Sequence, residues 1–222
     1  TIEKDQSYVL AVMGRERLAR SLFPLGDAAS KADIRVEAAA RGLSLSEKPD
    51  SYDICFVADG DTAGFLRRRL GDRPGEVMDD SGELVGAHSG SYQFTVGQRK
   101  GLRLPRPAPD GAPRYVTEIR PETNTVVVGP STLLSVDEIR GEDVVWLAED
   151  VPAVSPHPAT FQLRAHGEAH PGVVVREGGS LTVTLDGTVR GVAAGQSVVV
   201  YDGSRVLGQA TIASSRRRTG SA

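Results

Sequence analysis

The 222-residue sequence has one cysteine, few aromatic residues and no long apolar run. A single cysteine, Cys55, excludes an intramolecular disulfide framework and is compatible with a reducing cytosol. No apolar stretch approaches the roughly 20 residues that a membrane-spanning helix needs. The N-terminal "TIEKDQSYVL" also lacks the charged-then-apolar pattern of a secretory signal. We therefore expect a cytoplasmic protein with no membrane partner.

Common nucleotide and metal motifs are missing too. No G-x-x-x-x-G-K-[ST] occurs, and no G-x-G-x-x-G follows a predicted strand. The four histidines are scattered, so we expect no metal site. The net charge is −3, which excludes an overall basic protein, but arginines cluster locally. One cluster, "GQRKGLRLPRP", is held on a loop by its glycines and prolines and could still contact nucleic acid.

The periodicity of the apolar residues divides the chain. Residues 1–58 are mostly helical, and Ser30 is a predicted N-cap with Asp33 three positions on. Two hairpins follow, with turns at "DDSG" and "PETN", and then five or six short strands without a helix, which favours a closed or nearly closed β-barrel. The predicted fold class is multidomain α/β plus β. Its parts are residues 1–58, a mixed central domain at 59–131, a barrel at 132–213 and a disordered tail at 214–222.

Cys55 lies in "DICFV", a predicted short strand that opens into the turn "DGD". A lone cysteine in an apolar strand is usually buried and inert. A reactive thiolate needs a lowered pKa, which Lys48 could favour and the neighbouring aspartates would oppose. The spacing alone leaves both hypotheses open.

Two further segments offer hydrogen-bond donors suited to RNA. The "GQRKG" loop places Arg99 and Lys100 between glycines, and this pattern suits phosphate and ribose oxygens. The predicted barrel contributes Arg164 with His166, and Gln196 on a loop, which could read an exposed base edge. The loop pattern is equally typical of a charged β-turn, and the barrel residues taken singly are more typical of ordinary surface.

Five ordered segments give the sequence a family resemblance. They are "KDQSYVL" (4–10), "FPLG" (23–26), "KPDSYDICF" (48–56), "FTVGQRKGL" (94–102) and "GQSVVVYDG" (195–203). Together they resemble the bacterial tRNA-specific 2-thiouridylase family, which puts sulfur on C2 of the wobble uridine of tRNA. The resemblance extends over nearly the whole chain, to about Ile212.

The resemblance implies a domain order. Members of this family begin with a Rossmann-like ATP-pyrophosphatase domain whose S-G-G-x-D-S loop binds ATP, continue with a small central domain, and end in an elongation-factor-like β-barrel. The present sequence contains neither that loop nor the family's first catalytic cysteine. We therefore expect a C-terminal portion of such a protein that binds no ATP or Mg²⁺ itself and is inactive alone.

The resemblance also implies roles for individual residues. Cys55 matches the cysteine that carries a persulfide, supplied by a donor protein that receives sulfur from a cysteine desulfurase. The resemblance implies tRNA contacts at Lys4, Asp5, Gln6, Arg164, Ala165 and Gln196. The loop pattern described above adds Arg99 and Lys100 to the predicted tRNA contacts. Ala165 stands where the family has tyrosine, so a stacking or hydroxyl contact is lost there.

The implied chemistry is ATP-dependent sulfur transfer. ATP adenylates the C2 oxygen of the uridine, Mg²⁺ assists at the phosphates, and the persulfide delivers its terminal sulfur before the other cysteine forms a disulfide. The uridine must leave its stack to be reached. The alternative hypotheses are a non-catalytic RNA-binding module with a structural cysteine, and a protein-interaction barrel that binds no RNA.

Overall fold

The computed structural model describes residues 5–47, 57, 61–105, 108 and 110–218. Its helical elements are α1 (Ser7–Leu10), η2 (Ala11–Met13), α2 (Gly14–Ala19), α3 (Lys31–Ala40), η3 (Ser44–Glu47), α4 (Thr62–Leu70), η4 (Ser91–Gln93) and η5 (Ser131–Leu134). Its strands are β1 (Gly75–Asp79), β2 (Leu84–His88), β3 (Tyr115–Arg120), β4 (Thr125–Gly129), β5 (Ser135–Trp146), β6 (His157–Gln162), β7 (Ala169–Glu177), β8 (Ser180–Arg190), β9 (Ser197–Asp202) and β10 (Arg205–Arg216).

The barrel encloses the largest hydrophobic core among the described residues. Six antiparallel strands close in the order β10-β5-β8-β7-β6-β9, which confirms the predicted barrel. Alternate side chains fill the interior, and the largest fully buried one is Phe161. Closure leaves no unpaired strand edge in the barrel.

A four-stranded sheet forms the second β unit. Its order is β2-β1-β4-β3, in which β1 pairs parallel with β4 while both predicted hairpins pair antiparallel. The sheet's small core contains Val77, Val116, Val126 and Val128, and Leu102 enters it from the loop that follows η4. The loop with the predicted RNA contacts is therefore fastened to this core at one end.

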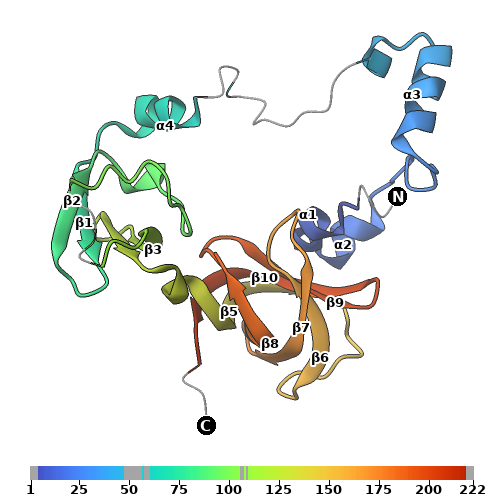
Figure 1. Ribbon diagram of the computed structural model, residues 1–222. Helices are drawn as coiled ribbons and strands as arrows, with labels where there is room; N and C mark the ends of the chain where they lie inside the picture. The colour runs from blue at the N-terminus through green and yellow to red at the C-terminus, as the bar shows by residue number, and fades with distance from the viewer. Residues whose placement is uncertain (1–4, 48–56, 58–60, 106–107, 109, 219–222) are drawn as a thin grey trace.

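The N-terminal helices divide into a docked part and an exposed part. Ala11 is 2% exposed and packs with Val199 and Tyr201 of β9, so α1 and η2 lie against the barrel (Figure 1). Helix α3 begins at the predicted cap, where the Asp33 N–H donates to Ser30 Oγ at 3.1 Å. None of the α3 side chains is buried, and Val36 is 70% exposed.

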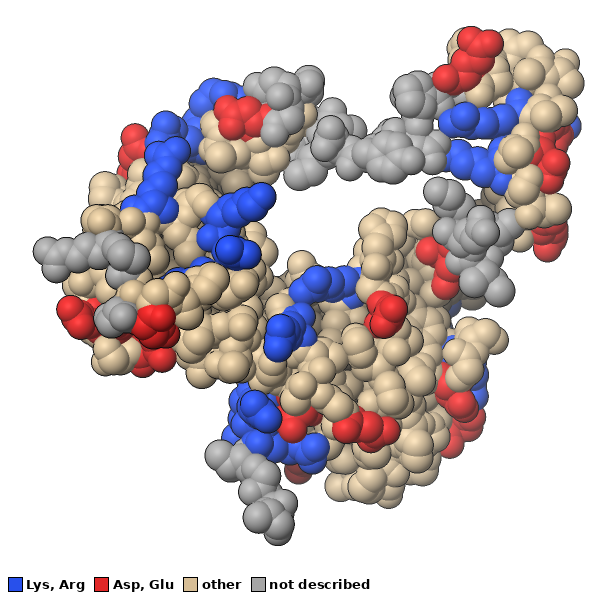
Figure 2. Space-filling model, viewed as in Figure 1, with Lys and Arg blue, Asp and Glu red and all other residues tan. Residues whose placement is uncertain are grey.

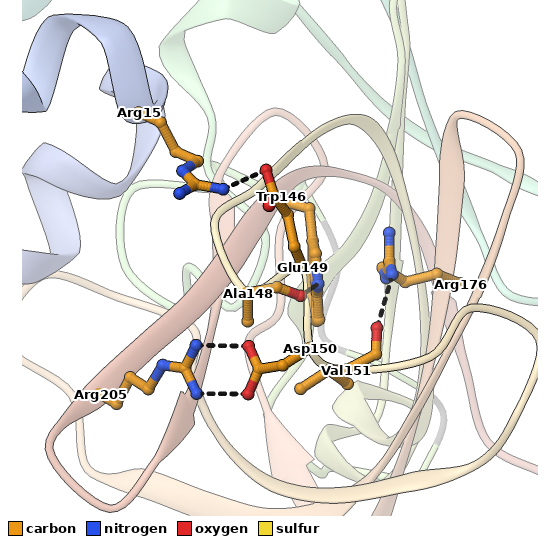
Figure 3. Close-up of polar contacts among 8 residues, drawn as sticks. All are labelled: Arg15, Trp146, Ala148, Glu149, Asp150, Val151, Arg176 and Arg205. Carbon is orange, nitrogen blue, oxygen red and sulfur yellow. Dashed lines mark hydrogen bonds and ion pairs between the residues drawn. The ribbon is translucent and has the colours of Figure 1, made fainter.

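Three arginines from three elements hold the loop between β5 and β6 (Figure 3). They are Arg15 of α2, paired with Glu149; Arg205 of β10, paired through both guanidinium NH groups with Asp150; and Arg176 of β7, which donates to the carbonyl of Val151. Hydrogen bonds from Arg205 lower the pKa of Asp150 to about 2. The loop therefore ties helix α2 to two barrel strands.

The C-terminal prediction was partly wrong. Residues 214–216 belong to β10, where Arg216 pairs with Glu138 of β5 in the strand register. The Arg218 N–H then donates to Asp137 Oδ1 at 2.6 Å. The segment lacks apolar residues, but backbone pairing and two carboxylates on β5 compensate for the missing burial. The remainder of the predicted tail, 219–222, lies outside the described residues.

Candidate nucleic-acid interface

The predicted arginine loop, residues 97–103, has a rigid internal frame. The Gly97 N–H donates to the Val116 carbonyl at 2.8 Å, and the Val116 N–H donates to the Gln98 carbonyl at 2.9 Å. The Gln98 side chain accepts from the Thr95 N–H and donates to the Lys100 carbonyl. The Gln98 side chain therefore stabilises the loop from within, while Arg99 and Lys100 are exposed at its tip.

The arginine loop also borders a shallow pocket of about 580 Å³. Arg99 and Arg103 line it together with Arg114, whose guanidinium is paired with Asp110. Arg103 has a φ of 50°, in the left-handed region that residues with a Cβ rarely adopt. Its charge joins the predicted pair at positions 99 and 100, so the loop carries three cationic side chains.

The barrel presents its predicted contacts on two adjacent turns. Arg164 and Ala165 are exposed on the turn between β6 and β7, and Gln196 is exposed on the loop between β8 and β9. The Arg164 guanidinium donates to the carbonyls of Arg190 at 3.1 Å and Gly191 at 2.7 Å. Arg164 therefore fixes the neighbouring loop, a role that the sequence pattern did not indicate.

The arginine loop and the barrel turns meet at two glycines. A Cβ placed on Gly97 would lie 3.8 Å from the Cα of Gly191, while a Cβ on Gly191 would collide with the Arg164 guanidinium. The predicted contacts at Arg99, Lys100, Arg164 and Gln196 thus come from neighbouring loops of two units. Figure 2 shows Lys and Arg side chains gathered on both sides of the hollow between the sheet unit and the barrel.

The N-terminal predicted contacts lie at the start of α1. Asp5 and Gln6 are exposed, and the Asp5 carboxylate accepts the Ser7 N–H at 2.9 Å and the Ser7 hydroxyl at 2.6 Å. Asp5 therefore satisfies the first turn of α1 in the manner of a capping residue. Lys4 and Cys55 lie outside the described residues, so their predicted roles stay predictions.

A cluster of hydrogen-bonded polar residues between α1 and the barrel was not predicted from the sequence. Tyr8 donates to the Ser197 carbonyl at 2.9 Å, and the Tyr201 hydroxyl contacts Ser7 Oγ at 3.1 Å and Gln162 Oε1 at 3.0 Å. Burial raises the pKa of both tyrosines, so both hydroxyls remain protonated donors near neutral pH. The one available signal was Tyr201 itself, a polar-tipped residue in the apolar strand "SVVVYD".

Metal-ligating side chains are dispersed over the described residues. No three His, Cys, Asp or Glu side chains within them lie close enough together to hold a metal ion. The sequence has no glycine-rich phosphate loop. Within the same residues, no helix is long and apolar enough to cross a membrane.

Comparisons with known proteins agree with this arrangement. Three family profiles match the chain: the tRNA methyl transferase HUP domain at residues 1–59, the tRNA methyl transferase PRC-barrel domain at 63–130 and the aminomethyltransferase beta-barrel domain at 136–212. The second covers the four-stranded sheet and the third covers the closed barrel.

Curated relatives match along almost the whole chain. The tRNA-specific 2-thiouridylase MnmA of Beutenbergia cavernae is 64% identical, over 96% of this chain and 57% of its own length. The proteins of the same name from Salinispora tropica and Renibacterium salmoninarum are 55% and 52% identical, over 60% and 58% of their lengths. The chain thus spans about three fifths of these relatives. With its helical first part, mixed sheet and closed barrel, it belongs to the tRNA-specific 2-thiouridylase family.

Proposed function

We propose that this chain supplies the tRNA-binding surface and the persulfide cysteine for 2-thiolation of the wobble uridine. The observation that carries the proposal is the junction of the arginine loop with the barrel turns at Gly97 and Gly191, beside Arg164. Loops from two units meet there, so one bound RNA could contact both. The relatives are named as tRNA-specific 2-thiouridylases, which supports tRNA as the ligand.

The division of labour follows from the chemistry of the exposed groups. Arg99 and Lys100 would bind phosphate oxygens as charged donors, which position the RNA without reading its sequence. The exposed amide of Gln196 can donate and accept at once, so it suits a base edge or a ribose hydroxyl. Ala165 offers neither hydroxyl nor ring and would contribute only backbone contacts. Asp5 and Gln6 would approach the RNA from α1.

A salt titration tests the phosphate contacts. Each phosphate contact contributes about 0.7–0.9 to the slope of log affinity against log salt concentration. The double substitution Arg99→Gln with Lys100→Gln should therefore lower the slope for an unmodified tRNA transcript by about 1 to 2. Arg120→Gln is the matched control, because Arg120 lies on the same sheet but donates twice to Glu118 at 2.8 Å. Equal slopes in all variants, or no salt-dependent tRNA binding, would refute this interface.

The role of Cys55 is to hold the sulfur that is transferred. It is the only thiol in the chain, so alkylation reports on it without interference. We expect alkylation of Cys55 to be faster in the native than in the denatured protein, and we expect radiolabelled sulfur from a cysteine-desulfurase-charged donor protein to become bound to the wild type but not to Cys55→Ser. Slower native alkylation and no labelling would favour the non-catalytic RNA-binding module.

The chain alone is proposed to produce no 2-thiouridine. Its sequence lacks the S-G-G-x-D-S loop that the family uses for ATP. Incubation with ATP, Mg²⁺, tRNA and a charged sulfur donor should leave the tRNA unmodified by mass spectrometry. Formation of 2-thiouridine under these conditions would overturn this part of the proposal.

A further inference from the structure

A chain of polar contacts connects the start of α1 with the turn between β6 and β7. It runs from Asp5 through Ser7 and Tyr201 to Gln162, at oxygen–oxygen distances of 2.6, 3.1 and 3.0 Å. The Gln162 amide nitrogen continues it to the carbonyls of Ala165 at 3.3 Å and Gly167 at 3.4 Å. The two ends, Asp5 and the Arg164–Gly167 turn, are separately predicted tRNA contacts.

The direction of the chain is fixed at its barrel end. Two carbonyl oxygens can accept only from the amide NH₂ of Gln162, so its Oε1 must face Tyr201. Tyr201 is 9% exposed and packs in the cluster with Ala11 and Val199, which holds its hydroxyl in place. The Tyr201 hydroxyl is therefore the donor to Gln162.

Counting hydrogens shows that the chain is short of one donor. Three oxygen–oxygen contacts join Asp5, Ser7, Tyr201 and Gln162, but only two of these groups, the hydroxyls of Ser7 and Tyr201, carry a hydrogen into them. When Ser7 donates to the Asp5 carboxylate and Tyr201 donates to Gln162, no hydrogen is left for the contact between Ser7 Oγ and Tyr201. When a ligand group donates to Asp5 and displaces the Ser7 hydroxyl, Ser7 can donate to Tyr201 while Tyr201 still donates to Gln162.

We propose that Tyr201 and Gln162 are positioning residues that couple the Asp5–Ser7 segment to the Arg164–Gly167 turn. A hydrogen-bond donor that binds Asp5 lets the hydroxyls of Ser7 and Tyr201 donate in one continuous direction towards Gln162. This stabilises the Arg164–Gly167 turn. No proton changes owner in this step. In a continuous chain each hydrogen bond polarises the next, so the gain is cooperative. The identity of the donor as an RNA hydroxyl or amino group rests on the proposed function.

Asp5→Asn imitates the engaged state without RNA. The Asn side chain can still accept the Ser7 N–H through its oxygen, and its NH₂ can donate to Ser7 Oγ, where the carboxylate only accepted. The measurement is the rate of hydrogen–deuterium exchange of the Gly167 amide. This amide donates to the Arg164 carbonyl at 3.1 Å and closes the turn. Since one hydrogen bond contributes a factor of about 2 to 10, Asp5→Asn should slow this exchange within that range.

Tyr201→Phe should have the opposite effect and remove the coupling. It keeps the packed ring but leaves Gln162 Oε1 without its donor, so Gly167 exchange should rise about 2- to 10-fold. In the Tyr201→Phe and Ser7→Ala backgrounds Asp5→Asn should no longer change the exchange. Tyr8→Phe is the matched control: it removes a hydrogen bond between the same helix and β9 without touching the chain. An Asp5→Asn effect that persists in Tyr201→Phe, or a Tyr8→Phe effect equal to that of Tyr201→Phe, would overturn the proposal.

Binding of an unmodified tRNA transcript separates this inference from the proposed function. Tyr201→Phe should weaken tRNA binding several-fold relative to Tyr8→Phe. If the exchange responds as expected but even the wild type binds no tRNA, the coupling stands and the proposed function fails. If tRNA binds while Gly167 exchange is indifferent to every variant, the coupling fails and the proposed function stands.

Discussion

Gly191→Ala tests whether Arg164 anchors the loop that carries Gln196. Gly191 has a φ of 71°, so a Cβ is strained there by about 1–2 kcal/mol whatever its surroundings. The same Cβ would collide with the Arg164 guanidinium, which must move and lose its bonds to the Arg190 and Gly191 carbonyls. Because Arg164 is exposed, we take about 1 kcal/mol for both bonds together. The expected loss of unfolding free energy is about 2–3 kcal/mol.

The same loop provides the control. Gly195 has a φ of 83°, but nothing lies within 4 Å of a Cβ built on it, so Gly195→Ala should cost only the strain of about 1–2 kcal/mol. In an Arg164→Ala background, Gly191→Ala should also cost only that strain, which gives a coupling of about 1 kcal/mol between positions 164 and 191 and none between 164 and 195.

Urea denaturation followed by tryptophan fluorescence measures these differences. Trp146 is the chain's single tryptophan and lies on β5, so it reports unfolding of the barrel that carries the substitutions. If Gly191→Ala costs no more than Gly195→Ala, or if its excess cost survives removal of Arg164, then the guanidinium does not hold the loop and the reasoning is refuted.

Three further substitutions test other parts of the fold. Val154 has a φ of 65° and is 67% exposed, so Val154→Asn should raise the free energy of unfolding in urea by about 1 kcal/mol; a decrease would contradict the strain. Burial lowers the pKa of His88, whose ring nitrogens have no partner within the described residues. As the pH is lowered below about 6.5, the unfolded chain therefore takes up this proton before the folded protein does, and the free energy of unfolding decreases. His88→Phe should remove this part of the dependence of the free energy of unfolding on pH, measured by urea denaturation at several pH values. The Arg176 guanidinium lies 4.3 Å from the Trp146 ring centroid, so Arg176→Met should cost about 1–2 kcal/mol and shift Trp146 emission; an unchanged spectrum would refute the stacking.

Local signals in the sequence were sufficient for the elements of the fold. The Ser30 cap, the hairpin turns and the two-residue period of the barrel strands act through neighbouring residues, so they are visible in one sequence. The C-terminal limit of β10 was missed because residues 214–216 have no apolar pattern and pair through their backbone. Composition alone cannot show such pairing.

The site was less predictable because its contacts are distant in sequence. The arginine loop was visible as a charged, glycine-bounded segment, and its exposed tip agrees with that reading. Ser7, Gln162 and Tyr201 meet only after the barrel has closed, and no spacing rule connects them. Arg164 looked like a surface charge, yet its two carbonyl partners, at positions 190 and 191, become its neighbours only in the folded barrel.

The position of β10 in the barrel has a consequence for biosynthesis. β10 pairs with β5 on one side and with β9 on the other, so the last strand of the barrel in sequence is the one that closes it. Until residues 205–216 have left the ribosome, β5 and β9 keep open edges that can pair with other chains. Pairings between distant parts of a chain also form slowly. Chaperones that shield strand edges should therefore matter most until this last strand of the barrel has been synthesised.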